Sequence, residues 1–209
     1  PDAVPGNGIC ETSPGNGACS LRAAIQEANA YPGQQTITLT PNTYTLTMAG
    51  ANEDGTATGD LDITDDLIIE SSTGNASQVI ISGNTLDRVF DLPPSGSPNV
   101  TLRGLTIKEG MIEDSTGGGL RNAQGTLTLE NSVITNNQSN GSGGGLSHMG
   151  GTLTLRNTQV TNNMSEGLGG GLQAQNGTVT INGNSQFRGN SANFGGGLSV
   201  GRANGTVTD

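Results

Sequence analysis

The chain has 209 residues, of which 35 are glycine and only 2% are aromatic, with no tryptophan. Because 31% of the residues are nevertheless hydrophobic, the composition argues against a disordered chain and favours short strands joined by tight turns. The formal net charge of −10 excludes nucleic acid as an expected partner, since phosphate binding requires clustered cations. No apolar run is long enough to predict a membrane span.

Residues 1–35 are predicted to form an N-terminal cap with a disulfide loop and a helix. A disulfide bond between Cys10 and Cys19 would close a short loop. In the chain-entropy model this closure would stabilise the folded state by about 3 kcal/mol. The alternatives are two free thiols or half of a metal site, and the single histidine of the chain disfavours the metal site. A disulfide would indicate an oxidising compartment.

A short amphipathic helix is predicted directly after the second cysteine. Apolar residues with helical spacing follow a plausible N-cap, Ser20; they are Leu21, Ala24, Ile25 and Ala28. The sequence Tyr-Pro-Gly should stop the helix by Gly33. We expect this helix, pinned by the Cys10–Cys19 bridge, to cover the open end of the fold that follows.

Internal repetition dominates residues 36–209. The tetrapeptide Gly-Gly-Gly-Leu recurs at intervals of 26 residues, beginning at Gly117, Gly143, Gly169 and Gly195. Each unit contains three strand-like pieces, and weaker copies such as "DLIIESS", "VIISGN" and "RVFDLP" lie upstream. A unit of this size is about one coil of a parallel β-helix, with coils about 4.8 Å apart. We predict an all-β fold: a parallel β-helix of about seven coils, with three strands in each coil.

Strand alternation predicts which side chains stack inside this solenoid. One inward column should be formed by Leu120, Leu146, Leu172 and Leu198, and two more by Leu127/Leu129, Leu153/Leu155 and Val179/Ile181. The glycines are expected at a recurring corner whose backbone only glycine adopts without cost, and the missing side chains should let coils lie close together. An outward column should alternate in charge and so attract along its length, through Glu70, Arg103, Glu130, Arg156 and Asn182.

Several motifs resemble those of secreted bacterial β-helix proteins that begin with Cys-Ser-Leu-Arg-Glu-Ala-Ile. Here the motif is "CSLRAAIQEANAYPG", with Ala23 in place of the usual glutamate at the third helical position. The stretches "GDLDITDDLII" and "LDRVFDL" are also similar, and the Gly-Gly-Leu coils resemble repeats of polymorphic outer-membrane proteins. The resemblance implies a right-handed parallel β-helix that is exported to the cell surface or beyond.

An enzyme with this fold would need a cation to take a proton, or paired carboxylates. The candidates are Lys108 and His148, but no column of acidic residues lies obviously beside His148, which is expected on the surface. Lys108, Glu109, Glu113 and Asp114 are interpreted as solvated loop charge. We therefore predict no catalytic residue and no cofactor.

An acidic run offers a candidate Ca²⁺ site, since carboxylates and carbonyls are the ligands of this ion. Its members are Asp54, Asp60, Asp62, Asp65 and Asp66. Their spacing does not match an EF-hand loop, and aspartate is common in turns. Turn residues are the preferred interpretation, and no metal is predicted.

Outward threonines suggest a different binding surface. Two parallel columns are expected from Thr126/Thr128, Thr152/Thr154, Thr178/Thr180 and Thr206/Thr208. Such an array is how some ice-binding solenoids work, but threonine is also simply favoured on exposed strands. Ice binding is therefore the weakest of the alternatives.

Asn-x-Ser/Thr sequons recur along the chain and are candidate glycosylation sites. They begin at Asn75, Asn99, Asn137, Asn140, Asn163, Asn176 and Asn204. The pairs Asn136–Asn137 and Asn162–Asn163 are more simply interpreted as stacked corner amides.

The last residues, "GRANGTVTD", begin another coil. An exposed strand at Gly205, Thr206, Val207 and Thr208 would present an edge for pairing. Either the natural protein continues beyond it, or subunits associate end to end into a filament. The leading hypothesis is a non-catalytic extracellular structural protein, a rigid surface rod or filament subunit with an adhesive role. The alternative is a protein that binds or degrades a surface polysaccharide.

Overall fold

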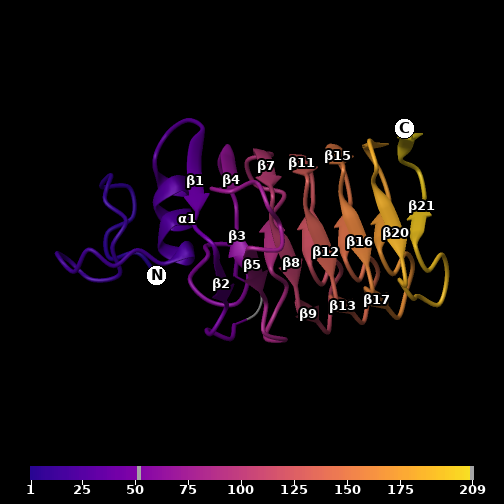
Figure 1. Ribbon diagram of the computed structural model, residues 1–209, viewed down its shortest axis with the longest axis horizontal. Coiled ribbons are helices and arrows are strands. Elements are labelled where there is room, and N and C mark those ends of the chain that lie inside the picture. The colour runs from indigo at the N-terminus through magenta and orange to yellow at the C-terminus, as the bar shows by residue number, and fades with distance from the viewer. Residues whose placement is uncertain (51–52, 208–209) are drawn as a thin grey trace.

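The chain winds into stacked turns of parallel β-strands with one helix at its N-terminal end (Figure 1). The computed structural model describes residues 1–50 and 53–207. Successive turns lie side by side along the long axis, with the N-terminal segment at one end and the last strand at the other. The predicted all-β parallel solenoid with a short N-terminal helix is confirmed.

Three long sheets and one short sheet run along the solenoid. Sheet A contains β1 (Gln35–Leu39), β4 (Leu67–Ser71), β7 (Asn99–Arg103), β11 (Thr126–Glu130), β15 (Thr152–Arg156), β19 (Thr178–Asn182) and β22 (Asn204–Val207). Sheet B contains β2 (Asn42–Thr45), β5 (Val79–Ser82), β8 (Thr106–Lys108), β12 (Val133–Thr135), β16 (Gln159–Thr161) and β20 (Gln186–Arg188). Sheet C contains β3 (Leu61–Asp62), β6 (Phe90–Leu92), β10 (Leu120–Asn122), β14 (Leu146–His148), β18 (Leu172–Ala174) and β21 (Leu198–Val200). Sheet D contains β9 (Met111–Ile112), β13 (Gln138–Ser139) and β17 (Met164–Ser165).

The predicted coil arrangement needs two small corrections. Among the described residues only sheet A has seven strands, and sheets B and C have six each, so the expected seven coils were slightly too many. The middle coils also have a fourth strand, in sheet D, where three were expected. The two-residue strands of sheet D lie just before the glycine corners and were too short to stand out in the sequence.

The predicted columns of aliphatic side chains form the core. Leu120 pairs with Leu146, and Leu146 with Leu172, in the parallel register of sheet C. The leucine pairs of sheet A stack in the same way, and all of these side chains are buried in one continuous cluster. Because each turn presents its apolar residues to the turns on either side, no turn could bury them alone.

The three glycines of the tetrapeptide that begins at Gly143 have two roles. Gly143 has a left-handed backbone with a φ of +69°. A Cβ on Gly144 would lie 2.1 Å from the carbonyl oxygen of Met164 in the next turn. A Cβ on Gly145 would lie 2.9 Å from the side-chain amide of Asn163. Both expectations for the glycines are therefore confirmed: one residue provides the corner conformation, and the other two allow close stacking.

Stacked asparagines line the inside of this corner. The Nδ2 of Asn137 donates to the Oδ1 of Asn163 at 3.0 Å, and the Nδ2 of Asn163 donates to the Oδ1 of Asn190 at 3.0 Å. Asn137 and Asn163 are each only 1% exposed. Their interpretation as stacked corner amides is confirmed, and this buried ladder satisfies polar groups that would otherwise destabilise the fold.

The outward charge column of sheet A is also confirmed. Arg103 lies between Glu70 and Glu130, with N–O distances of 3.1 and 2.9 Å, and Arg156 reaches Glu130 at 3.4 Å. These side chains are partly exposed, so each pair contributes little on its own. Their main effect is on which turns stack, because a stack that skipped one turn would place glutamate on glutamate or arginine on arginine.

The helix α1 (Leu21–Ala30) covers the first turn, as predicted. Ser20 is its N-cap and accepts a hydrogen bond from the amide of Ala23 at 3.1 Å. Leu21, Ile25 and Ala28 pack into the solenoid core. None of the described helical residues forms a segment long and apolar enough to cross a membrane.

The predicted disulfide is present, but it does not hold the helix against the solenoid. Cys10 and Cys19 are bonded within the N-terminal arm, with a Cα–Cα distance of 5.2 Å. The helix is held instead by buried Arg22, whose guanidinium donates to backbone carbonyls of residues 56–60. Asn29 adds hydrogen bonds to the backbone of Asp62 and Thr64 at 2.8 and 3.0 Å. These contacts explain why the opening motif contains an arginine and an asparagine at these positions.

Candidate functional site

The outer face of sheet C carries an unbroken column of polar side chains. The register of the sheet stacks one residue from each strand, in the order Asp62, Asp91, Arg121, Ser147, Gln173 and Ser199. Each lies beside an inward aliphatic residue, so strand alternation turns it away from the core. The column begins in an acidic pocket and continues into a groove lined mainly by uncharged side chains.

The acidic pocket has a volume of about 380 Å³. Its charged lining consists of five carboxylates and two arginines: Glu53, Asp54, Asp60, Asp87, Asp91, Arg88 and Arg121. Arg88 bridges two of these carboxylates. Its Nη1 lies 2.9 Å from Asp60 and 3.2 Å from Asp91, and its Nε donates to the carbonyl of Gly117 at 3.1 Å.

Burial controls the protonation of the carboxyl groups. It raises the pKa of Asp60 to about 7, although Arg88 acts in the opposite direction. Burial, with the charge of Asp60, raises the pKa of Asp62 to about 8, and burial also raises the pKa of Asp87. Arg121 forms a two-point ion pair with the carboxylate of Asp91, with the Nε at 2.8 Å from Oδ1.

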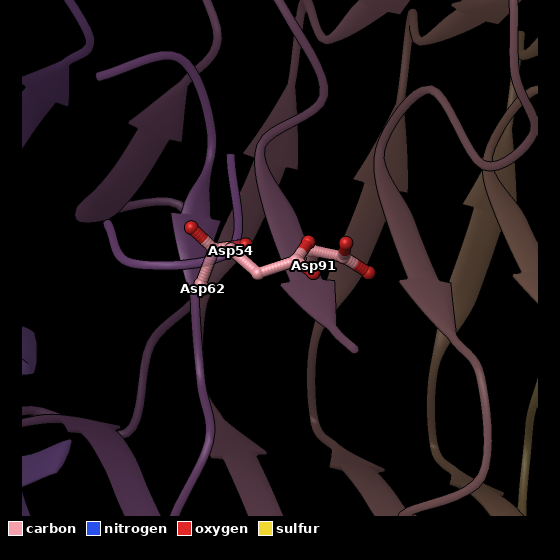
Figure 2. A group of neighbouring side chains, drawn as sticks. All are labelled: Asp54, Asp62 and Asp91. Carbon is pink, nitrogen blue, oxygen red and sulfur yellow. The ribbon is translucent and has the colours of Figure 1, made fainter. Parts of the chain in front are cut away.

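Three carboxylates from separate segments converge beside this pocket. Asp54 comes from the loop before β3, Asp62 from β3 and Asp91 from β6, and one oxygen of each lies within 4.8 Å of the others. Figure 2 shows the three side chains next to one another. Asp62 is fully buried. Its Oδ2 accepts from the amide of Thr56 at 2.7 Å, and its Oδ1 has no hydrogen-bond partner among residues 1–50 and 53–207.

The structure only partly reproduces the predicted acidic group. Asp54, Asp60 and Asp62 come together, whereas Asp66 bonds to Asn99 at the start of β7. Asp65 accepts a hydrogen bond from the amide of Asp66. The sequence analysis missed Asp87, Arg88, Asp91 and Arg121. The signal was present in "LDRVFDL", since strand alternation around buried Phe90 turns Asp91 outward beside Asp62.

This groove lies farther along the same face and has a volume of about 590 Å³. Hydroxyl and amide side chains dominate its lining, among them Ser147, Gln173, Gln175, Asn176 and Ser199. The Oγ of Ser147 donates to the Oε1 of Gln173 at 3.2 Å, which links adjacent turns. Such a surface can donate and accept hydrogen bonds but offers no aromatic platform.

The prediction of a surface His148 was wrong. The side chain is fully buried, with its Nδ1 3.2 Å from the Nδ2 of Asn122 in the preceding turn. Strand alternation explains the position, because His148 lies two residues after inward Leu146 and so points inward as well. Its Nε2 has no hydrogen-bond partner in the described part of the chain, and burial lowers the pKa of His148 to about 4.

His148 should therefore make the protein less stable in acid. Its folded-state pKa is about 4, below the ordinary value of 6.5, so the unfolded chain takes up a proton that the folded state resists. The stabilising contribution of neutral His148 to the free energy of unfolding is fully present above pH 6.5. About 3 kcal/mol of it is lost as the pH falls toward 4.

Urea unfolding at pH 7 and pH 4.5 measures this loss. The matched variant is His148→Asn, because Asn122 already occupies the equivalent place one turn earlier. The variant should lose clearly less stability than the wild type between the two pH values. Equal losses would show that His148 does not carry the acid sensitivity.

Of the four residues interpreted as solvated loop charge, two are exposed and two form an ion pair. Glu113 and Asp114 are exposed. Lys108 forms an ion pair with Glu109 at 3.0 Å, and Glu109 also accepts from the hydroxyl of Ser82 at 2.7 Å. These contacts involve side chains on the surface of sheet B and its following turn.

The threonine columns are confirmed for three turns and corrected in the last. Thr152 stacks between Thr126 and Thr178, and the second column continues in the same way. In β22, however, Asn204 pairs with Thr178, and Thr206 with Thr180. The predicted register was two residues out, and Thr208 lies outside the described residues.

The sequons fall into two classes. Asn137 and Asn163 are buried in the asparagine ladder, so a glycan on either would be incompatible with this fold. The other five are exposed and stay predicted glycosylation sites: Asn75, Asn99, Asn140, Asn176 and Asn204. Gly205, Thr206 and Val207 of the predicted pairing edge lie in β22, the last strand in the order of sheet A.

No family model, curated protein or solved structure matches the chain. The resemblance to secreted β-helix proteins that the sequence motifs suggest therefore stays an expectation. Hydrogen bonds within those motifs join the helix to the first turns: Arg22 donates to the carbonyl of Asp60, and Asn29 donates to the carbonyl of Asp62.

Proposed function

We propose that the protein is a non-catalytic extracellular rod. The observation that carries this proposal is that the groups suited to acid–base chemistry are built into the scaffold. Asp60 and Asp91 bond to buried Arg88, while Asp62 and His148 have no exposed surface. A general acid or base must reach its substrate, so these groups serve stability better than turnover. The disulfide and the motif resemblance support export.

Incubation of the purified protein with a panel of acidic and neutral polysaccharides tests the non-catalytic part. We expect no new reducing ends and no unsaturated uronate products, and sustained turnover of any of these polymers would overturn it. Antibody labelling of intact source cells tests the location. Surface labelling is expected, and labelling only after permeabilisation would contradict an extracellular role.

A neutral polysaccharide is a second candidate, as a ligand and not a substrate. The groove on sheet C favours it, because its hydroxyls and amides match sugar hydroxyls and its lining contains only one charged residue, Arg202. Affinity electrophoresis against neutral glycans tests the idea. Gln175→Ala should weaken binding about tenfold, the effect of one lost hydrogen bond. Gln34→Ala, an exposed glutamine far from the groove, should have no effect.

End-to-end association through Gly205, Thr206, Val207 and Thr208 remains a prediction of the same proposal. Electron microscopy of the purified protein tests it directly. Filaments with a subunit repeat would support the filament version, and only single particles at high concentration would remove it while leaving the rod.

A further inference from the structure

The carboxylates of Asp54, Asp62 and Asp91 form the one acidic group in the described residues whose oxygens all approach one another within 4.8 Å. They come from three segments, and the sheet register places Asp62 directly beside Asp91. Like charges at paired positions destabilise a sheet. The outward column of sheet A avoids this by alternating glutamate and arginine, so the stacked aspartates need a different explanation.

A second observation concerns the hydrogen bonds of Asp62. Its side chain has no exposed surface, and its Oδ1 accepts no hydrogen bond from any residue that the structure describes. A buried carboxylate oxygen without a partner is costly, so such atoms generally bond to a donor or to a metal ion. The neighbouring carboxylates cannot supply a donor when ionised. A bound cation would satisfy this oxygen of Asp62 in place of a hydrogen-bond donor.

Charge balance in the adjoining pocket leads to the same conclusion. Its lining contains five carboxyl groups and only two arginines, so acidic side chains outnumber the cations. Arg88 and Arg121 both bind Asp91, and Arg88 also binds Asp60. Asp54 and Asp62 have no arginine contact among the ion pairs of the described residues. Two of the three clustered carboxyl groups thus have no cationic side chain as a partner in the described part of the chain.

We propose that Asp54, Asp62 and Asp91 bind a calcium ion. The site offers only oxygen ligands, which suit Ca²⁺ and Mg²⁺ rather than Zn²⁺. Two oxygens bound to one Ca²⁺ at 2.3–2.6 Å can be up to about 5 Å apart, so every pair in this group is within range. Pocket water and backbone carbonyls would complete the six to eight ligands that Ca²⁺ takes.

Calcium here would join three parts of the cap region. Asp54 belongs to the loop that leads into residues 56–60, and Arg22 of the helix binds the carbonyls of this loop. Asp62 and Asp91 belong to the first two strands of sheet C. An ion between them would fasten the loop, and through it the helix, to the solenoid.

Calorimetric titration and thermal unfolding of the full chain test the site. Ca²⁺ alone should bind the EDTA-treated protein with a Kd of about 10⁻⁴–10⁻³ M, the range of extracellular modules. At roughly ten times the Kd it should raise the Tm by about 3–6 °C. Mg²⁺ at the same concentration should have a much smaller effect, because it demands a tighter octahedral geometry.

Two variants and a control connect this effect to the site. Asp62→Asn should abolish the Ca²⁺-dependent rise in Tm. It should not lower the Tm in EDTA, because the asparagine side chain carries no charge and its oxygen can still accept from the amide of Thr56. Asp54→Asn, in an exposed position, should weaken binding at least tenfold without affecting the fold. Asp114→Asn, at an exposed aspartate outside the cluster, should bind as the wild type does.

The proposal is overturned by any of three results. The wild type could give no heat of binding and the same Tm in Ca²⁺ and in EDTA. Mg²⁺ could match Ca²⁺, which would indicate a general ionic effect. Finally, Asp54→Asn could retain full Ca²⁺ affinity, which would place any bound ion elsewhere.

Discussion

Gly144→Ala is expected to destabilise the protein by more than about 4 kcal/mol, an exceptional value for a single methyl group. The new Cβ would lie 2.1 Å from the carbonyl oxygen of Met164 and 2.7 Å from that of Gly170. Both atoms are backbone in the next turn and cannot rotate away as a side chain could. Relief would require the two turns to separate, with loss of the hydrogen bonds and apolar contacts between them.

Urea unfolding followed by circular dichroism measures this effect. The control is Gly205→Ala in β22, where a Cβ would meet nothing within 4 Å and the φ is not positive. It should unfold within about 0.5 kcal/mol of the wild type, as surface substitutions usually do. A Gly144→Ala variant that unfolds like the control would mean that the turns are not packed this closely at the corner.

Most of the solenoid could be predicted because two periods coincide. The repeat of 26 residues sets which positions stack, and the strand period of two sets which of them face inward. Together they predicted the leucine columns, the charge column and the glycine corners. The same two periods also required His148 to face inward, so that error came from leaving the strand period unused.

The last turn shows a limit of matching by sequence likeness. "GTVT" at 177–180 and at 205–208 suggested that these segments stack, but they are 28 residues apart. The structure keeps the 26-residue interval, so Asn204 lies on Thr178. The shift by two preserves which side chains face outward, which is why the prediction of exposed threonines still held for Thr206.

The acidic pocket could not be predicted in full, because it depends on what covers a strand and not on the strand itself. Alternation places Asp62 and Asp91 on the outer face, where solvent would be the ordinary expectation. The loop before β3 and the side chain of Arg88 cover that face instead, and both aspartates are at most 2% exposed. The loop has no counterpart in the 26-residue repeat.

Arg88→Ala is expected to lower the free energy of unfolding by about 3–5 kcal/mol, because it leaves buried charges without a partner. Asp60 and Asp91 would each lose an ion pair, and the carbonyls of Thr116 and Gly117 would lose their donors. Unfolding should be measured in EDTA at pH 8, above the pKa of about 7 that Asp60 has in the folded wild type.

Arg103→Ala is the matched control, since Arg103 also bridges two carboxylates on neighbouring turns, Glu70 and Glu130. The arginine side chain is 43% exposed there, against 5% for Arg88. Water can replace the lost contacts of an exposed pair, so the expected cost is about 1 kcal/mol or less. The two variants thus remove the same kind of bridge and differ mainly in burial. Equal costs would mean that water reaches the pocket freely, and burial could then no longer explain the raised pKa of Asp60.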